Sequence, residues 1–159
     1  MIASDLLQID STALIPDEPS SAPMIVNLAT DQDIRARVHE LLMLAERPAP
    51  QGERRRDRRY PYPYLVRMTP VGGDGRSPSG QTIIVVGRTL SEGGFGFYHS
   101  QPLAERRMIA SFHAGDDRWL GFLMDLRWCR FIGEGWYESG GRFLMPVPGL
   151  PAAETGAGI

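Results

Sequence analysis

The stretch TIIVVGRTLSEGGFGFY, residues 82–98, contains two predicted β-strands and the turn that joins them. Residues 82–90 are rich in isoleucine and valine, whose branched side chains pack well on a pleated surface. Two glycines after Glu92 favour a turn, and residues 94–98 then form the next strand. The stretch therefore predicts a pair of neighbouring strands, and the sequence on both sides of it adds more.

Six strands are expected in all, with glycine-rich turns and no helix between them. They are residues 62–69, 82–90, 94–98, 107–113, 118–131 and 136–146. Six short strands imply an antiparallel sheet that closes on itself, because closure removes unpaired edges. The expected fold class is therefore mainly β: a six-stranded antiparallel β-barrel with an N-terminal α-helix and disordered termini.

The last two expected strands carry further local signals. Alternation along residues 118–131 assigns four side chains to the barrel interior: Phe122, Met124, Leu126 and Trp128. Gly133 and Gly135 predict the hairpin turn between the two strands. The pair Gly140 and Gly141 predicts a bulge or a close approach of two backbones.

An amphipathic helix is expected at residues 30–47. Thr30 offers an N-cap, and acidic residues follow it in the first turn. Five apolar residues recur at helical spacing and form one stripe: Ile34, Val38, Leu41, Leu42 and Ala45. Pro48 then ends the helix. The stripe is expected to pack on its own domain or on a second copy of the chain.

Composition limits the possible partners and the compartment. The chain of 159 residues has a net charge of −2, so it has no overall field that recruits DNA or anionic membranes. Residues 1–29 contain acids and no basic residue, and are expected to be a flexible acidic tail; residues 148–159 are expected to be a second flexible tail. A single cysteine fits a reducing compartment, and no segment has the roughly 20 apolar residues that span a bilayer. A cytoplasmic protein without membrane insertion is expected.

The sequence favours no enzymatic chemistry. His39, His99 and His113 each stand alone, without a second ligand at metal-binding spacing. Cys129 lies within an expected strand with no histidine nearby, and no phosphate-binding glycine loop is present. We therefore expect a protein that is not an enzyme and that has no metal and no cofactor.

A cluster of arginines precedes the first expected strand in the stretch ERRRDRRYP, residues 53–61. All seventeen basic residues of the chain are arginines, and arginine can hold a phosphate or the O6/N7 edge of guanine with two parallel hydrogen bonds. Tyr60, Tyr62 and Tyr64 follow the cluster and could stack bases of a single-stranded nucleic acid. The negative net charge disfavours that alternative. The cluster therefore suits a compact anionic ligand.

Two motifs resemble those of the PilZ domain family, small β-barrels that bind the bacterial second messenger cyclic di-GMP. Arg55 and Arg59 match the family's Arg-x-x-x-Arg motif ahead of the first strand, and Arg54 with Arg58 has the same spacing. Residues 89–94, TLSEGG, match Asp/Asn-x-Ser-x-x-Gly except that Thr89 replaces Asp or Asn. The resemblance covers residues 53–146 and implies a PilZ-like barrel domain at residues 48–147.

The resemblance also implies a ligand site for cyclic di-GMP. Its residues are Arg54, Arg55, Arg59, Thr89, Ser91 and Gly94. In this reading Arg55 and Arg59 grip phosphate and guanine, Ser91 and Thr89 donate or accept hydrogen bonds, and Gly94 provides backbone geometry. A threonine brings one hydroxyl, so Thr89 cannot act as a bidentate partner.

Two functions of different class remain open at this point. In the first, the chain is a cyclic di-GMP receptor that passes the signal to a downstream protein partner or self-associates through the 30–47 helix. In the second, it is a PilZ-like barrel that no longer binds nucleotide and acts only as a protein-interaction module. Thr89 favours the second function, while the arginine motif, Ser91 and Gly94 favour the first.

Overall fold

The computed structural model describes residues 21–45 and 58–151, with side chains from Thr30 onward. The chain divides into two compact units, residues 1–32 and 33–159. In the first unit the described part, residues 21–32, is the beginning of helix α2 (Ser21–Leu44). The predicted tails lie largely outside the described residues, as do Arg54 and Arg55. The site and its surroundings belong entirely to the second unit.

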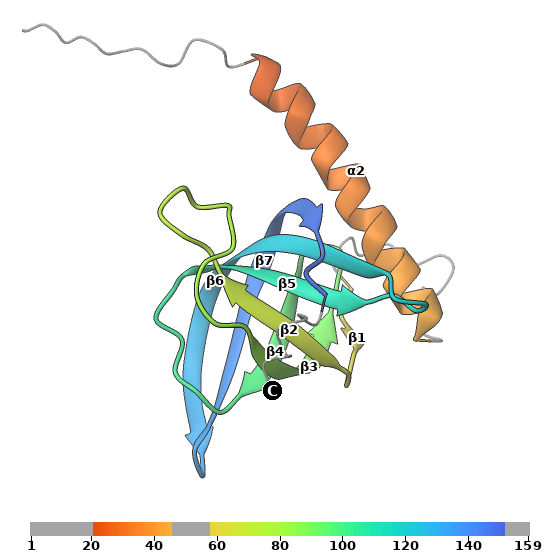
Figure 1. Cartoon of the computed structure of the whole chain (residues 1–159). Coiled ribbons are helices and arrows are strands. Elements are labelled where there is room, and N and C mark those ends of the chain that lie inside the picture. Colours follow the sequence, from red (N-terminus) through yellow and green to blue (C-terminus); the bar gives the residue numbers. More distant parts are fainter. Residues whose placement is uncertain (1–20, 46–57, 152–159) are drawn as a thin grey trace, which may run out of the picture. The chain divides into compact units, whose positions relative to one another are not determined.

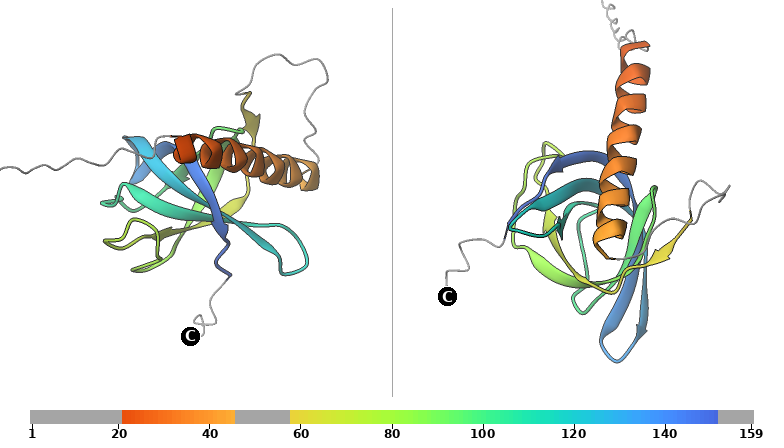
Figure 2. Two further views of the ribbon diagram at one scale, coloured as in Figure 1. Left: turned by 90° about the horizontal axis from the view of Figure 1, so that it is seen from above. Right: turned by 90° about the vertical axis from the view of Figure 1, so that its right-hand side faces the viewer.

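The second unit contains seven strands and the remainder of α2 (Figure 1). The strands are β1 (Tyr60–Pro61), β2 (Leu65–Pro70), β3 (Ile83–Leu90), β4 (Gly94–His99), β5 (Arg107–His113), β6 (Trp119–Gly133) and β7 (Trp136–Pro148). Six of them pair antiparallel in the order β3-β2-β5-β6-β7-β4, and the additional pairing of β3 with β4 closes the ring (Figure 2). The six-stranded antiparallel barrel predicted from the sequence is therefore confirmed.

The entry into the barrel differs from the expected strand at residues 62–69. The chain pairs first at β1, leaves the ladder, and pairs again from Leu65 onward as β2. Pro61 and Pro63 explain the interruption, because a proline has no N–H to donate to a sheet ladder. As a result β1 pairs with the end of β3 while β2 pairs with its beginning.

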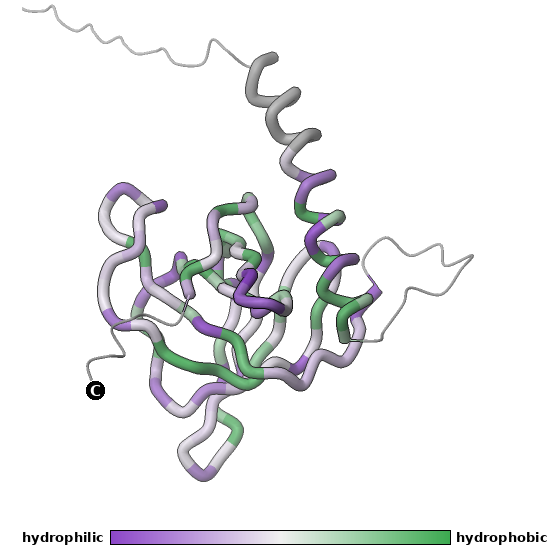
Figure 3. The backbone as a smooth tube through the Cα atoms, turned by 45° about the vertical axis from the view of Figure 1, so that its right-hand side comes forward, coloured by the Kyte–Doolittle hydropathy of each residue, from purple (hydrophilic) through white to green (hydrophobic). Residues whose placement is uncertain are grey.

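Aromatic rings pack against one another within the barrel interior, beside aliphatic and methionine side chains. Phe97, Phe112 and Phe122 are fully buried. The ring of Phe112 meets the edges or faces of four others, at centroid distances of 4.9 to 6.3 Å: Tyr62, Phe95, Phe122 and Phe143. Hydrophobic and hydrophilic stretches are interspersed along the described backbone (Figure 3). The alternating pattern of the sequence thus supplies a closed apolar core.

Helix α2 begins at Ser21 and ends at Leu44, so Thr30 lies inside it and is not its N-cap. Pro23 lies in the first turn of this helix, where proline is tolerated because its missing N–H would have no partner in any case. The apolar stripe is confirmed: Ile34, Val38, Leu41 and Leu42 are all buried and join the barrel's own core cluster. The stripe therefore packs on the chain's own domain, the first of the two alternatives, and self-association through the helix stays a prediction.

Strand β6 corrects one prediction about the barrel interior. Phe122 and Met124 are buried as expected, but Trp128 is 43% exposed. Leu126 pairs with Gly141 and Trp128 with Gly140, so Arg127 is an extra residue that forms a bulge. A bulge shifts the alternation by one position, which turns Trp128 to the outer face. The predicted close approach at Gly140 and Gly141 is confirmed: a Cβ on Gly141 would lie 2.4 Å from the Asp125 carbonyl oxygen.

Candidate ligand-binding site

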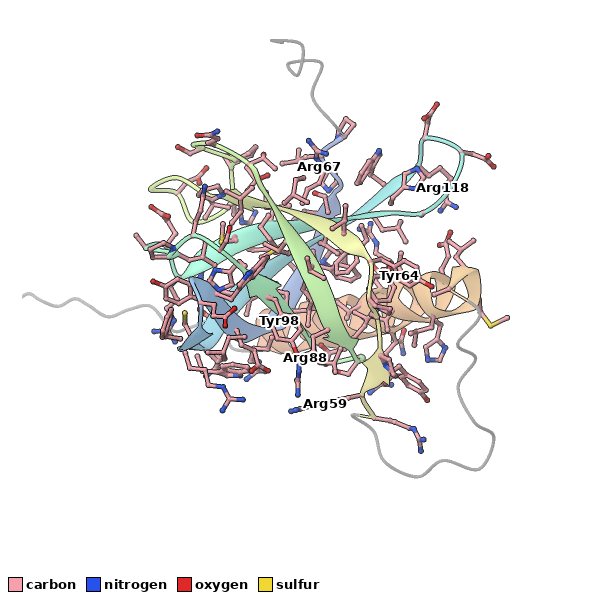
Figure 4. All side chains as sticks on the ribbon, turned by 90° about the horizontal axis from the view of Figure 1, so that it is seen from below. Arg59, Tyr64, Arg67, Arg88, Tyr98 and Arg118 are labelled. Atoms are coloured by element: carbon pink, nitrogen blue, oxygen red, sulfur yellow. The ribbon has the colours of Figure 1, made fainter. Side chains whose placement is uncertain are left out.

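The described end of the arginine segment, residues 58–61, lies beside the end of β3 at one edge of the barrel. Tyr60 pairs with Leu90 and Pro61 with Thr89, and the Tyr62 N–H donates to the Arg88 carbonyl at 3.0 Å. Arg58 and Arg59 directly precede β1, so the chain that carries them enters the barrel beside the end of β3. Figure 4 shows Arg59 and Arg88 at this edge, and Arg67 and Arg118 at the opposite one.

Both described arginines of the segment are exposed. The Arg58 guanidinium lies 5.5 Å from the centre of the Tyr60 ring, a cation–π distance. Arg59 is the second arginine of the predicted Arg55/Arg59 pair and immediately precedes β1. Arg54 and Arg55 lie outside the described residues.

Ser91 is buried, and its hydroxyl is used within the turn. It accepts hydrogen bonds from the N–H groups of Gly93 and Gly94, at 3.2 and 3.1 Å. The Ser91 N–H in turn donates to the Gly94 carbonyl at 2.9 Å. These bonds satisfy donors that the turn would otherwise leave unpaired, so the serine holds the turn between β3 and β4 in shape.

Gly94 is required by a close approach of two backbones. A Cβ at this position would lie 2.1 Å from the carbonyl oxygen of Gly141 on β7. No side chain fits at that distance, so only glycine lets β4 approach β7 at the start of their ladder. The geometric role that the motif resemblance gave to Gly94 agrees with this contact.

Glu92, which the sequence did not single out, joins the turn to the helix. Its carboxylate lies 3.3 Å from Arg35 Nε and 2.8 Å from His39 Nε2. Arg35 and His39 are four residues apart and therefore lie on one face of α2. Helical spacing could have paired Arg35 with His39, but it gave no sign of the acid that both side chains contact.

Thr89 faces a row of small residues on the outer surface of the barrel. It pairs with Gly96 on β4, and Gly96 pairs with Gly140 on β7. The Thr89 Oγ1 lies 2.9 Å from the position of a Cβ on Gly96, and an Arg88 terminal nitrogen lies 4.0 Å from the same point. The Trp128 ring lies against Gly140, where a Cβ would be 2.7 Å from the ring. Thr89 and Arg88 of β3 thus lie over Gly96, and Trp128 of β6 lies over Gly140.

Glu138 is a buried carboxylate on the same outer face, next to that row. It is 4% exposed and forms ion pairs with two arginines. Arg88 Nε lies 3.0 Å from Oε2, and Arg130 donates from Nε and a terminal nitrogen to Oε1 at 3.2 and 2.9 Å. The Arg130 guanidinium also lies 5.7 Å from the centre of the Trp128 ring. Sequence patterns could not find this group, because it depends on the β6 bulge and on pairing between distant strands.

The histidines take part in packing and ion pairs. His99 is buried between the Gln101 carbonyl, 2.7 Å from Nδ1, and the Ser139 hydroxyl, 2.8 Å from Nε2. Burial lowers the pKa of His99, which favours the neutral ring. Among residues 21–45 and 58–151, no cluster of three or more acidic, histidine or cysteine residues could hold a metal ion, and no helix is long and apolar enough to cross a membrane.

Comparison with known protein families gave no match, and comparison with curated proteins gave none either. Among solved structures, the chain is similar to the Bacillus subtilis inhibitor of motility MotI/DgrA, with a TM-score of 0.41 and 14% sequence identity. The match covers 70% of this chain and 52% of that one, so the chain spans about half the length of that structure. The closed ladder of six strands confirms the fold class expected from the sequence, a six-stranded antiparallel barrel with an N-terminal helix.

Proposed function

We propose that this chain is a cyclic di-GMP-binding receptor module of bacterial second-messenger signalling. One observation carries the proposal: β1 pairs with the last residues of β3, at Tyr60–Leu90 and Pro61–Thr89. This pairing supports a shared site because the described end of the arginine segment, Arg58 and Arg59, enters the barrel beside the strand that leads into the glycine turn. A site built from both motifs needs that proximity, whatever the position of Arg55.

The proposed chemistry divides the motif residues into two groups. Arg54, Arg55 and Arg59 bind the ligand, with guanidinium groups that grip phosphate oxygens and the O6/N7 edge of guanine. Thr89 adds one hydroxyl at the edge of the site. Ser91 and Gly94 act through the backbone, since the Ser91 hydroxyl is bonded within the turn and Gly94 permits the close approach to β7.

Isothermal titration calorimetry with cyclic di-GMP tests the proposal on wild type, Arg55→Ala, Arg59→Ala and Arg118→Ala. We expect wild type to bind and each motif variant to lose at least about tenfold in affinity, because charge-assisted hydrogen bonds are lost. Arg118 lies at the opposite edge of the barrel, so Arg118→Ala controls for the loss of one positive charge (Figure 4). Equal heats for wild type and both motif variants would rule out the receptor function.

A protein-interaction module without nucleotide is the second candidate. It is favoured by Thr89 and by three exposed apolar side chains at the end of the β6–β7 hairpin: Phe131, Ile132 and Trp136, which are 61%, 46% and 41% exposed. Thr89→Asp separates the two candidates. A receptor is expected to bind cyclic di-GMP with similar or higher affinity after this change, whereas an interaction module shows no heat with either protein.

A further inference from the structure

We propose that Arg88 and Arg130, held by Glu138, extend the ligand site across the outer face of the barrel as a clamp for a phosphate group of the cyclic dinucleotide. This inference rests on the proposed function and adds residues that neither sequence motif contains. The clamp is formed by β3, β7 and β6, which provide Arg88, Glu138 and Arg130 respectively. Trp128, beside Arg130, supplies an exposed aromatic face.

The first argument is the placement of charge. A carboxylate that is 4% exposed is costly to bury alone, and here it is offset by two guanidinium groups. The three groups together carry a net charge of +1. Arg88 and Arg130 remain 39% and 66% exposed, so both cations can reach a ligand in solvent while the acid cannot. The cluster therefore presents positive charge outward.

The second argument is preorganisation. Arg88 contacts Glu138 through Nε, and Arg130 does so through Nε and one terminal nitrogen. In the described part of the chain, these contacts leave other N–H donors of both guanidinium groups for a ligand. A long arginine side chain normally loses rotamer freedom when it binds, and a buried carboxylate that already fixes it lowers that cost. The Arg130 fork is held by hydrogen bonds to Oε1, and the Arg88 guanidinium is held by its ion pair with Oε2, which makes no hydrogen bond in the described part of the chain. Two guanidinium forks that share one carboxylate suit the geometry of phosphate oxygens.

The third argument is continuity with the motif site. The terminal nitrogen of Arg88 and the hydroxyl of Thr89 both lie over Gly96, at 4.0 and 2.9 Å from the position of a Cβ there. Gly140 follows Gly96 across the sheet, and the Trp128 ring covers it. The two glycines place no side chain of their own between Thr89 and Trp128. One ligand can therefore touch Thr89, Arg88 and the Trp128–Arg130 pair on the same face.

Calorimetry with cyclic di-GMP tests the clamp on Arg88→Ala, Arg130→Ala and a matched control, Arg67→Ala. The Arg67 guanidinium lies 5.7 Å from the Trp119 ring, the same distance as that of Arg130 from Trp128, but at the opposite edge of the barrel. We expect each clamp variant to bind about tenfold more weakly, and Arg67→Ala to bind like wild type. If Arg88→Ala fails to fold, Arg88→Lys replaces it in the test, because lysine keeps the positive charge but lacks the planar fork. We expect Arg88→Lys to bind cyclic di-GMP more weakly than wild type as well.

The Glu138→Gln substitution tests whether Glu138 positions the two arginines or acts only through its negative charge. The substitution makes the cluster more positive by one unit, so an effect of charge alone predicts tighter binding of the anionic ligand. A clamp predicts weaker binding, because Arg88 and Arg130 lose the group that fixes them. In the Arg88→Ala/Arg130→Ala background no clamp arginine is left for Glu138 to position, so Glu138→Gln should no longer weaken binding, whereas a general loss of structure would still weaken it.

The outcomes distinguish this inference from the proposed function. If Arg59→Ala abolishes binding while Arg88→Ala and Arg130→Ala bind like wild type, the receptor function stands and the clamp is wrong. If Glu138→Gln binds more tightly than wild type, the carboxylate does not position the arginines and the clamp is wrong as well. A wild-type protein that gives no heat overturns both proposals.

Discussion

At the scale of single residues, Gly94 is the described glycine at which an added Cβ would come closest to another atom. Gly94→Ala would place a Cβ 2.1 Å from the Gly141 carbonyl oxygen, and neither backbone can move without breaking the β4–β7 ladder. We expect a loss of about 3 kcal/mol in the free energy of unfolding, measured by urea denaturation. Gly73→Ala is the control, because nothing lies within 4 Å of a Cβ at that position. Similar midpoints for the two variants would contradict the close approach.

Tyr62 makes the free energy of unfolding depend on alkaline pH. Burial, with a smaller contribution from Tyr64, raises the pKa of Tyr62 from its usual 10 to about 12. The folded state therefore retains the phenol proton at pH values where the unfolded chain loses it. The stabilisation from this group is complete below pH 10 and is lost between pH 10 and 12, with a total effect of about 2 kcal/mol.

Tyr62→Phe removes this pH dependence while it keeps the ring. We expect the difference in unfolding free energy between wild type and Tyr62→Phe to be constant up to pH 10 and then to shift in favour of the variant. Chemical denaturation at several pH values measures that difference, and the other tyrosines cancel from it. Parallel curves up to pH 12 would show that the phenol of Tyr62 ionises freely in the folded protein.

At the scale of elements, the second half of α2 is part of the barrel core. Leu41 is 1% exposed, whereas Met43, two residues later on the same helix, is 63% exposed. We expect Leu41→Ala to lower the free energy of unfolding by about 3 kcal/mol through lost burial and a cavity, and Met43→Ala to change it by less than about 0.5 kcal/mol. Thermal unfolding of both variants measures the contrast, and equal effects would mean that the helix does not pack as described.

The elements also show where sequence reasoning succeeds and where it stops. The six barrel strands and the apolar stripe of α2 were predictable because their patterns are local, with a period of two or of 3.6 residues, although the first strand starts at Leu65 and not at residue 62. The outward turn of Trp128 was not, since the extra residue Arg127 has no signature of its own and becomes a bulge only through pairing with β7. The start of α2 at Ser21 was missed because Thr30, a good cap, is also acceptable inside a helix.

At the scale of the whole molecule, the apolar core formed by the described side chains lies within the second unit. Every residue of the core cluster lies at or after Ile34, and the second unit begins at Asp33. We expect a chain without residues 1–32 to keep the melting temperature of wild type. A chain without residues 1–45 loses the four buried side chains of the stripe, and we expect it to be unfolded or to melt at a much lower temperature. Circular dichroism on the two truncated chains checks this, and equal melting temperatures would contradict it.

Barrel closure could be inferred from the number of strands, but the composition of the site could not. The two motifs gave Arg59, Thr89, Ser91 and Gly94 by resemblance, and β1 brings their segments together. The contacts of Glu92 with α2 and of Glu138 with Arg88 join residues that are distant in sequence. Such contacts form only when the barrel has closed, so no local sequence pattern predicts them.

The carboxylate of Glu92 belongs to the glycine turn, while its two neighbours, Arg35 and His39, belong to the helix. A ligand that draws this carboxylate away from Arg35 and His39 releases part of what fastens α2 to the barrel. Linkage is reciprocal, so anything that fastens the helix more firmly weakens such a ligand by the same factor. Binding of such a ligand at the turn would therefore loosen α2 from the barrel. A partner that holds α2 against the barrel would lower the affinity of the turn for that ligand.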